Sequence, residues 1–472
     1  MRWQWSTTLL HAVAWLTLTS SGMATSPFSF SVRSDVNTSE IYPSTRLTRY
    51  GGWIPSPVVY NSFIHKHRVI ASGRMSNGSA HIPAVAEFER AIKSDPVMTE
   101  LWNQIFLQVS PLNQVPGFDG LLYMLDQVLV EPPSFHMARD AQGNIIQGES
   151  IGVPVYVLMD LLANTGAAHD LFRMPAYAAA LKKMLNSWGT YLTSPDSNKT
   201  LTDDVEGWFG PTALASLQSA DRGTFDSTYV VPNPNMTSRG FPSFDAFFTR
   251  EVQDSARPIL NPDDSSLIVS ACESTVYRIA KNASLHDQFW LKAQHYSLYD
   301  MLNHDNDLAT QFVGGTVYQA FLSPQDYHRW RSPVDGVISK VVIVPGTYYA
   351  ALPDEGAPAD DPDFPEGDPH GAAIRSQAWI AHSSARALIY IKSDNPKIGL
   401  MCFIGIGMGE VSTVDVTVKK GQQVKKGTEL GMFHFGGSSH ALLFGPQANI
   451  TFADDVQLDT HHKVMSTIAQ VS

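Results

Sequence analysis

The pattern of apolar residues changes at Pro232-Asn233-Pro234, and this change limits the chain to a fold with two kinds of region. Before it, apolar residues recur at the spacing of one helix face, as Val85, Phe88 and Ile92 do. After it, short runs rich in β-branched and aromatic residues are separated by turn residues. The sequence therefore predicts an α+β protein, helical first and β-rich second.

The helical part is predicted to form a domain over residues 82–235, preceded by an irregular lead-in over 25–81 that is rich in Ser, Thr, Pro and Gly. Pro83 suits the first turn of a helix, and Ser94-Asp95-Pro96 ends that helix and begins the next. Further helices are expected over 117–131, 152–164, 168–188 and 211–219.

The β-rich part is predicted to span residues 236–472 and to form a sandwich or hybrid barrel with a few helices. Seven acidic residues, with prolines and glycines among them, fall over 353–370 and predict a mobile surface loop or, alternatively, a lid over an active site. The expected strands are 266–270, 316–322, 336–344, 387–391, 398–406, 411–418 and 429–435.

Composition argues against several classes of partner. The net charge of −12 argues against nucleic acid and against electrostatic docking on anionic membranes. The two cysteines, Cys272 and Cys402, provide no disulfide framework, and each is predicted to be a small buried residue, with a bridge between them as the alternative in a secreted chain. His461-His462 has no companion ligands in the sequence, so we interpret it as a solvated tail and predict no metal site.

The N-terminus is typical of a secretory signal peptide over residues 1–24, with Arg2 followed by a short apolar stretch and small residues before the cleavage position. This predicts a secretory-pathway or extracellular protein, and an extended N-terminus on a cytoplasmic enzyme is the alternative. Potential N-glycosylation sequons support secretion and occur at Asn37, Asn77, Asn198, Asn235, Asn282 and Asn449.

The turn Gly436-Gly437-Ser438-Ser439 follows an apolar strand-like run and suggests a self-processing site. The Gly437 carbonyl is unhindered, because glycine has no side chain. If Ser438 Oγ attacks that carbonyl, the amide becomes an ester, and elimination followed by hydrolysis leaves a pyruvoyl group. Ser439 offers a second hydroxyl as a local donor. Glycine-serine turns are common in loops, so this string gains specificity only from other motifs.

Such motifs are present, and over roughly residues 240–450 they resemble the phosphatidylserine decarboxylase family in content and order. The chain is most similar to the soluble fungal branch that includes the tryptophan decarboxylase of psilocybin biosynthesis, through residues 271–274, 327–330 and 432–435. The family-like motifs are Phe247-Phe248-Thr249-Arg250, Ala256-Arg257-Pro258-Ile259, the run from Phe321 to Arg329, Ser332-Pro333-Val334-Asp335-Gly336, Gly409-Glu410-Val411-Ser412-Thr413, and the glycine-serine turn.

The resemblance implies that residues 82–235 are an accessory domain and 236–472 a decarboxylase domain, cleaved between Gly437 and Ser438 into chains that stay associated. A carboxylate, a histidine and a serine cooperate in this cleavage in the family, and the matching residues are Glu273, His328 and Ser438. The cofactor is then a pyruvoyl group derived from Ser438, which forms a Schiff base with the substrate amine and accepts electrons as CO₂ leaves. His328 is expected near the reacting carboxylate or as the donor of a proton to the α-carbon.

Two positions depart from the family pattern. Glu273 replaces the usual aspartate but has the same charge, so it can still orient an imidazole. Arg331 replaces a second histidine, and arginine cannot act as a general base. Either His328 takes both roles, or His434 assists, or maturation is slow or absent. Arg331 could instead bind a substrate anion, so Arg331, His434 and Phe435 are predicted at the substrate site, with packing or solvent exposure as the alternative for His434.

The sequence therefore predicts a carboxy-lyase that acts on a small molecule, with a free and possibly aromatic L-amino acid as the favoured substrate. The first alternative is a phosphatidylserine decarboxylase that makes phosphatidylethanolamine. The second is a pseudo-enzyme or binding module that never matures, because Ser332-Pro333-Val334-Asp335-Gly336 also resembles part of biotinyl- or lipoyl-type barrels. Nucleic acid is not an expected partner, and the sequence gives no prediction of the oligomeric state.

Overall fold

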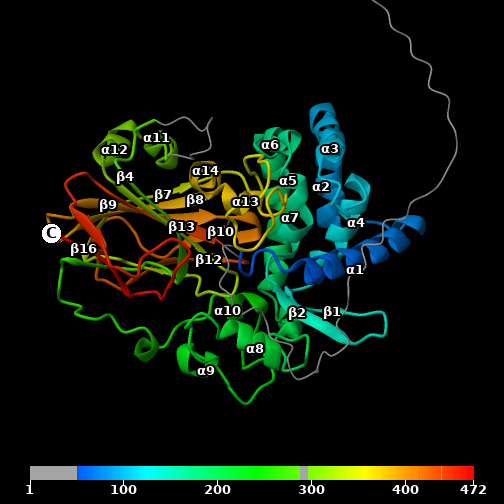
Figure 1. The fold of residues 1–472 in the computed structure, drawn as a ribbon, viewed down its shortest axis with the longest axis horizontal. Coiled ribbons are helices and arrows are strands. Elements are labelled where there is room, and N and C mark those ends of the chain that lie inside the picture. Colours follow the sequence, from blue (N-terminus) through cyan, green and yellow to red (C-terminus); the bar gives the residue numbers. More distant parts are fainter. Residues whose placement is uncertain (1–49, 287–295, 412, 437) are drawn as a thin grey trace, which may run out of the picture. The chain divides into compact units, whose positions relative to one another are not determined.

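The computed structural model describes residues 50–286, 296–411, 413–436 and 438–472. The predicted signal segment 1–24, the sequon at Asn37 and the glycine at 437 lie outside the described residues. The described residues belong to one compact unit. Their first part is mainly helical and their second part mainly β-sheet, so the α+β prediction is confirmed (Figure 1).

Proline marks where most of the longer helices begin. A proline has no backbone N–H to leave unpaired and its φ suits the first helical turn. The helices that begin this way are α1 (Pro57–Ser76), α2 (Pro83–Lys93), α3 (Pro96–Gln108), α5 (Pro154–Ala163), α7 (Pro175–Leu192) and α8 (Pro211–Leu217). Between them lie α4 (Phe118–Val128) and α6 (Gly166–Phe172), and the short α9 (Phe225–Thr228) and α10 (Phe244–Phe248) follow.

Three sequence predictions for this part are corrected. The supposed irregular lead-in contains α1, whose apolar side chains at Val59 and Phe63 are buried at the spacing of one helix face. The single helix predicted over 168–188 is two helices, because Pro175 begins a new one. A β-hairpin of β1 (Ser134–Arg139) and β2 (Ile145–Ile151) interrupts the helical part and was not predicted.

An eight-stranded antiparallel sheet forms the centre of the second part, in the order β11-β7-β8-β9-β13-β5-β4-β15. The predicted strands over 316–322 and 336–344 coincide with β5 and β7. The strands are β4 (Ser274–Lys281), β5 (Thr316–Leu322), β7 (Gly336–Val344), β8 (Arg386–Ser393), β9 (Leu400–Gly407), β11 (Gln423–Val424), β13 (Ser438–Phe444) and β15 (His461–His462).

The sheet separates two hydrophobic cores. Every residue of β13 is buried, because both of its faces are covered. Ala441 and Leu443 belong to the core shared with the helices, whereas Leu442 and Phe444 belong to a second core. Two three-stranded sheets contribute to the second core: β10 (Thr413–Val416), β12 (Glu429–His434) and β6 (Arg329–Arg331), and β14 (Ile450–Phe452), β16 (Thr467–Val471) and β3 (Leu267–Val269).

Short helices and loops complete the β part. The helices are α11 (Leu298–Met301), α12 (Asn306–Ala309), α13 (Ala372–Arg375) and α14 (Gln377–Ser383). The acidic segment 353–370 is tied to both parts of the chain: Asp354 pairs with Arg375 at 2.6 Å, and Asp361 accepts a hydrogen bond from the Tyr50 hydroxyl at 2.6 Å. Both cysteines are buried and free, so the alternative of a bridge between them is wrong.

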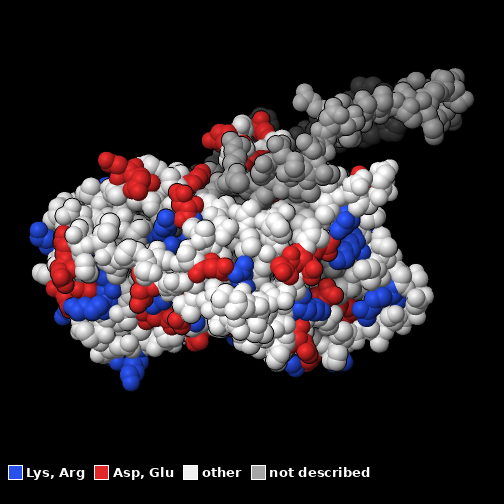
Figure 2. All heavy atoms as spheres, turned by 90° about the horizontal axis from the view of Figure 1, so that it is seen from below, with Lys and Arg blue, Asp and Glu red and all other residues white. Residues whose placement is uncertain are grey.

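The distribution of surface charge and the character of the helices are relevant to binding of nucleic acid and membranes. On the face seen in Figure 2, basic and acidic side chains are intermixed and no broad basic field is present. Across the described residues, no helix combines the length and the apolar character that a membrane span requires.

Candidate active site

Ser438 is the first residue of β13, the strand between β9 and β5. It lies opposite Gly407 on β9 and opposite Leu322 on β5. Its side chain is completely buried, although a serine hydroxyl prefers water or a hydrogen-bond partner. This hydroxyl therefore lies at the first residue of a central strand, and side chains from neighbouring elements surround it.

The chain is strained just before Ser438. Phe435 has a φ of +60°, in the left-handed region that side chains disfavour, and Gly436 has a φ of +111°, which glycine adopts without strain. The Phe435 ring is held against α7 at Gly189, where an added Cβ would lie 2.7 Å from the ring. Packing of Phe435 therefore helps to hold the turn in a conformation that stores strain at the predicted cleavage position.

His328 faces Ser438. Its Nδ1 lies 3.5 Å from Ser438 Oγ, and its Nε2 lies 3.0 Å from the Ser323 carbonyl oxygen. A carbonyl only accepts hydrogen bonds, so Nε2 carries the hydrogen and Nδ1 presents its lone pair to the serine hydroxyl. The ring is also stacked on Phe248 with centroids 4.0 Å apart. The imidazole is thus fixed in the tautomer that can accept a proton from Ser438.

Burial keeps this imidazole neutral. It lowers the pKa of His328 to about 3, against a smaller opposing effect of the nearby Asp326 carboxylate. At neutral pH the ring is therefore in its basic form and has no proton to give. This protonation state suits a general base for the Ser438 hydroxyl.

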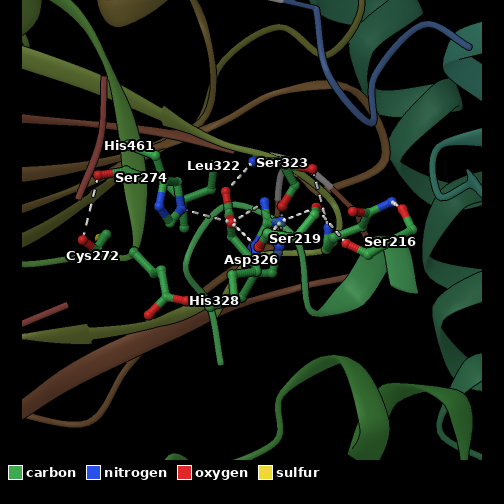
Figure 3. A network of polar contacts seen from close by, with 12 residues as sticks. Ser216, Ser219, Cys272, Ser274, Leu322, Ser323, Asp326, His328 and His461 are labelled. Carbon is green, nitrogen blue, oxygen red and sulfur yellow. Dashed lines mark hydrogen bonds and ion pairs between the residues drawn. The ribbon is translucent and has the colours of Figure 1, made fainter. Parts of the chain in front are cut away.

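Asp326 fixes the loop that holds His328. Its Oδ2 accepts a hydrogen bond from the Ser323 amide at 2.7 Å, and its Oδ1 accepts one from Arg222 Nε at 2.7 Å and lies 3.1 Å from His461 Nε2. Burial alone would raise the pKa of this carboxyl, but Arg222 and His461 hold it well below its usual range. Figure 3 shows Asp326 between Ser323 and His461, so the carboxylate orients His328 through the Ser323 loop.

Glu273 belongs to the same buried cluster but has another partner. Arg257 donates to its two carboxylate oxygens from Nε at 2.8 Å and from Nη2 at 2.9 Å. Ligand atoms of Glu273, Asp326 and His461 lie within 4.8 Å of one another, a spacing that would suit a metal ion. However, Arg222 and Arg257 already supply positive charge to both carboxylates. The predicted contact of Glu273 with His328 is absent from the described hydrogen bonds, and its role in cleavage stays a prediction.

Sequence analysis missed two members of this cluster. His461-His462 is not a solvated tail: the pair forms β15, His461 is opposite Thr275 on β4, and the His461 side chain is 4% exposed. Only the fold brings it to Asp326, since the two residues are far apart in sequence. Asp326 lies inside the family-like run from Phe321 to Arg329, so that motif was the signal that could have identified it.

The predicted substrate-site residues do not gather around Ser438 in one cluster. Arg331 donates to the Tyr327 hydroxyl at 2.6 Å and lies 3.9 Å from Glu429. His434 Nδ1 pairs with Asp245 at 2.8 Å; burial lowers its pKa, but this carboxylate outweighs burial and the net pKa is raised. Phe435 alone adjoins the strained turn directly, and the role of all three in substrate binding stays a prediction.

The two serines of the turn face opposite sides of β13, because successive residues of a strand alternate. Ser438 points to His328, whereas the Ser439 hydroxyl donates to the Ala320 carbonyl at 3.1 Å and accepts from Gln319 Nε2 at 3.0 Å. Gln377 Oε1 is also 3.0 Å from Ser439 Oγ. Ser439 thus anchors the strand to its neighbours, and its role as a local donor in cleavage stays a prediction.

A cavity of about 310 Å³ adjoins the His328 loop. Arg222, Ser323 and Gln325 line one part of it, and Tyr50 and Phe364 line another. Ser438 is not among its lining residues, so this cavity reaches the site only through Ser323, whose carbonyl holds His328. Phe364 belongs to the acidic segment 353–370, which therefore borders the cavity.

Comparison with known families accounts for this geometry. Two models described as phosphatidylserine decarboxylase match the chain, one over residues 244–470 and one over residues 82–217. The first match contains Ser438, His328, Asp326 and Glu273, and the second covers most of the helical part.

Individual relatives agree with these matches. The chain is 58% identical to "Decarboxylase iboD" of Amanita muscaria over 348 residues, which is 74% of this chain and 99% of that one. It is 34% identical to "L-tryptophan decarboxylase" of Psilocybe cubensis over 85% of this chain and 89% of that one. It is 30% identical to "Phosphatidylserine decarboxylase proenzyme 3" of Schizosaccharomyces pombe over 50% of this chain and 22% of that one.

Proposed function

Because this chain belongs to the phosphatidylserine decarboxylase family, we propose that it is a decarboxylase that makes a pyruvoyl group from Ser438 and acts on a free amino acid. The observation that carries this proposal is the 3.5 Å contact between Ser438 Oγ and the unprotonated Nδ1 of His328. It places a base beside the hydroxyl that has to become a nucleophile.

Self-cleavage needs the chain's own groups and one water molecule. His328 Nδ1 takes the proton of the Ser438 hydroxyl, Oγ attacks the preceding carbonyl so that a C–O bond replaces the C–N bond, and the proton passes to the freed amine. β-Elimination then breaks the Cβ–O bond and releases the first chain as a carboxylate, and water converts the remaining dehydroalanine to the pyruvoyl group and ammonia. The left-handed conformation of Phe435 favours cleavage, because breaking the chain releases its strain. Asp326 keeps the base in place by binding the Ser323 amide. In this scheme His328 is the base for cleavage, and Arg331 need not act as one.

The residues around Ser438 also suit decarboxylation. When present, a pyruvoyl group supplies a carbonyl that condenses with the substrate amine and accepts the electron pair left by CO₂. The chain's contribution is to exclude water, since the Ser438 side chain is fully buried, and to orient the reacting centre. Phe248 stacks on the ring of His328, and the Phe435 ring packs against Gly189 on α7.

A free amino acid is favoured as the substrate for two reasons. Two relatives that are 58% and 34% identical to this chain, and that match it over 99% and 89% of their own length, are named as a decarboxylase and as an L-tryptophan decarboxylase. In addition, the net charge is −12, which disfavours approach to an anionic lipid surface. The name of the second relative favours an aromatic side chain on the substrate.

Phosphatidylserine is the second candidate substrate, supported by the similarity to the Schizosaccharomyces pombe proenzyme over the catalytic half. The reacting groups would be the same, because the lipid headgroup carries the same amine and carboxylate. The two candidates therefore differ in how the substrate is recognised and share the chemistry at Ser438.

Mass spectrometry under denaturing conditions tests self-cleavage. We expect one chain that ends at residue 437 and a second chain over 438–472 whose N-terminus is blocked by a pyruvoyl group. Ser438→Ala should remain intact, whereas the matched variant Ser439→Ala should still be cleaved. Only intact protein in both the wild type and Ser438→Ala would favour the non-maturing pseudo-enzyme.

A panel of substrates tests which class of molecule the cleaved protein decarboxylates. Cleaved protein is given L-tryptophan, L-phenylalanine, L-tyrosine or phosphatidylserine vesicles, and CO₂ release is measured for each. We expect turnover of a free amino acid and little of the lipid. Turnover of vesicles alone would replace the substrate proposal and leave the cleavage chemistry unaffected.

A further inference from the structure

Glu410 occupies a segment that runs alongside the cleavage turn. Gly407 pairs with Ser438 in the β9–β13 ladder, and Thr413 pairs with His434 in the β10–β12 ladder. The links from β9 to β10 and from β12 to β13 therefore begin and end at paired residues. Glu410 is the middle residue of the first link, in a 3₁₀ turn over Gly409–Val411, and Phe435 and Gly436 belong to the second link. Because both links end at paired residues, Gly407 with Ser438 and Thr413 with His434, Glu410 lies in the segment next to Phe435 and Gly436.

The two carboxyl oxygens of Glu410 differ in their hydrogen bonds. Oε1 accepts a hydrogen bond from the Tyr156 amide at 2.9 Å, in the first turn of α5. Oε2 is buried without a hydrogen-bond partner among the described residues, and so is the nearby Tyr349 hydroxyl. The residue is 3% exposed. Tyr349 is the side-chain group that faces Glu410, and no hydrogen bond of normal length joins its hydroxyl to Oε2 among the described residues, so Oε2 remains available to a bound molecule.

The surroundings of Glu410 keep its carboxyl protonated at pH values where an exposed glutamate is ionised. Burial raises the pKa of this carboxyl to about 7, although the amides of Tyr156 and Val155 and the Tyr349 hydroxyl oppose the shift. The other titratable groups that face it, Tyr156 and Tyr349, have pKa values raised well above 10 by burial and are neutral. A proton is therefore available on Glu410 near neutral pH.

The remaining acids and bases near Ser438 lack such a proton. His328 is a neutral base whose Nε2 hydrogen is engaged with the Ser323 carbonyl. Arg222 and His461 lower the pKa of Asp326 and keep it ionised, and Glu273 forms an ion pair with Arg257. Decarboxylation, however, consumes one proton at the α-carbon of the substrate.

We propose that Glu410 is the proton donor for the decarboxylation, delivering the proton of Oε2 to the α-carbon of the substrate. The inference rests on the proposed function and names the acid for that site. The bond from the α-carbon to the carboxylate breaks and its electron pair stays with the α-carbon side. The O–H bond of Glu410 then breaks, a C–H bond forms at the α-carbon, and a proton from water restores the carboxyl after product release.

Protonation at the wrong carbon gives different products, and these products test the role of Glu410. If the α-carbon is not protonated promptly, the competing site is the carbon that came from the pyruvoyl ketone. Protonation there leaves the substrate nitrogen on the protein, so that the C-terminal chain begins with alanine, and water releases the rest of the substrate as an aldehyde. A residue that only supports the fold does not change this partition between amine and aldehyde.

The experiment compares cleaved wild type with Glu410→Gln, which keeps the Tyr156 hydrogen bond and removes the proton. We expect normal self-cleavage, a kcat lower by about 10²- to 10⁴-fold, and conversion of the C-terminal chain to the alanine form during turnover, with stoichiometric aldehyde. Mass spectrometry of the C-terminal chain and aldehyde trapping measure this. Asp160→Asn is the matched control: it is equally buried with an unpartnered Oδ2, but lies one helical turn further along α5. It should leave the partition unchanged.

The outcomes separate this inference from the proposed function. A wild type without a pyruvoyl chain refutes the proposed function itself. An active wild type together with a Glu410→Gln variant that makes amine without alanine formation refutes only the role of Glu410, as does a folded Glu410→Gln that fails to self-cleave. If Glu410→Gln does not fold, Glu410→Asp is used instead. Aspartate keeps the carboxyl group, but its side chain is one methylene shorter, so the acid lies further from the substrate. It should form more alanine than wild type, and an unchanged partition would refute the proposal.

Discussion

Two buried carboxyl groups at the site have opposite protonation behaviour. Asp326 and Glu410 are both nearly inaccessible to solvent, and burial by itself raises the pKa of each. Asp326 is beside Arg222 and His461, and its pKa falls well below the usual range. Glu410 is met by backbone amides and neutral tyrosines, and its pKa rises to about 7. The comparison shows that the countercharge, and not burial, decides which carboxyl acts as an anchor and which carries a proton.

The largest expected effect is at His328, which lies on the Asp326 side of this comparison. His328→Gln can still donate a hydrogen bond to the Ser323 carbonyl but has no lone pair of suitable basicity for Ser438. We expect self-cleavage to slow by about 10²- to 10⁴-fold, the usual contribution of a general base. The rate is measured by denaturing gel electrophoresis of newly purified protein. Cleavage at the wild-type rate would mean that another group acts as the base.

Asp326→Asn should destabilise the fold as well as slow cleavage. It leaves the Arg222 guanidinium buried without its countercharge, which costs about 3–5 kcal/mol in the free energy of unfolding. Denaturant titration of cleavage-deficient Ser438→Ala with and without this change measures that cost. Adding Arg222→Met should recover much of the stability but not the cleavage rate. Recovery of both would show that the carboxylate has no positioning role.

The two carboxyls should also give stability–pH profiles of opposite slope. The folded-state pKa of Glu410 is raised, so its stabilising contribution is complete below its unfolded pKa and is lost as pH rises through about 7. The shift from 4.5 to about 7 corresponds to about 3 kcal/mol. Glu410→Gln should therefore gain stability relative to its parent between about pH 5 and 8. The folded-state pKa of Asp326 is lowered, so its contribution is lost only as pH falls through the acid range.

This pH prediction is checked by denaturant titration of both proteins at several pH values, in the Ser438→Ala background to prevent cleavage. A difference between Glu410→Gln and its parent that does not change with pH would mean that Glu410 is ionised in the folded protein. The contrast between the two carboxyls would then be wrong.

The smallest effect is expected at Arg331, outside both carboxyl environments. Its guanidinium binds the Tyr327 hydroxyl and lies near Glu429, away from the described contacts of Ser438. Arg331→His should change the cleavage rate by no more than about threefold, since the lost contacts are partly exposed. A large acceleration would show that the family histidine position is used for cleavage in this chain after all. A higher KM with unchanged cleavage would support the predicted role in substrate binding.

Much of the site could be predicted from local patterns. The strand periods predicted the bounds of β5 and β7 correctly, whereas β13, which begins at Ser438, was not among the predicted strands. The family-like motif singled out His328, which the structure places 3.5 Å from Ser438. These features depend on residues close in sequence, where side-chain alternation and turn chemistry apply.

Other parts of the prediction failed where local patterns compete with packing. The segment around α1 has a weakly amphipathic composition and was assigned as irregular, yet α1 is stabilised by packing Val59 and Phe63 into the shared core. His461-His462 looked like a tail because it is short, but pairing with β4 buries it.

The sequence by itself determined the α+β architecture, the family, and the nucleophile and base of the proposed cleavage, because each is carried by a local pattern or by an ordered motif. Only the tertiary structure decided the charge state of the site. It paired Glu273 with Arg257 and brought His461 to Asp326, and it left Glu410 buried among neutral groups beside the cleavage turn. The reason is physical: the pKa of a carboxyl depends on burial and on charges within a few ångströms, and those neighbours come from distant parts of the chain.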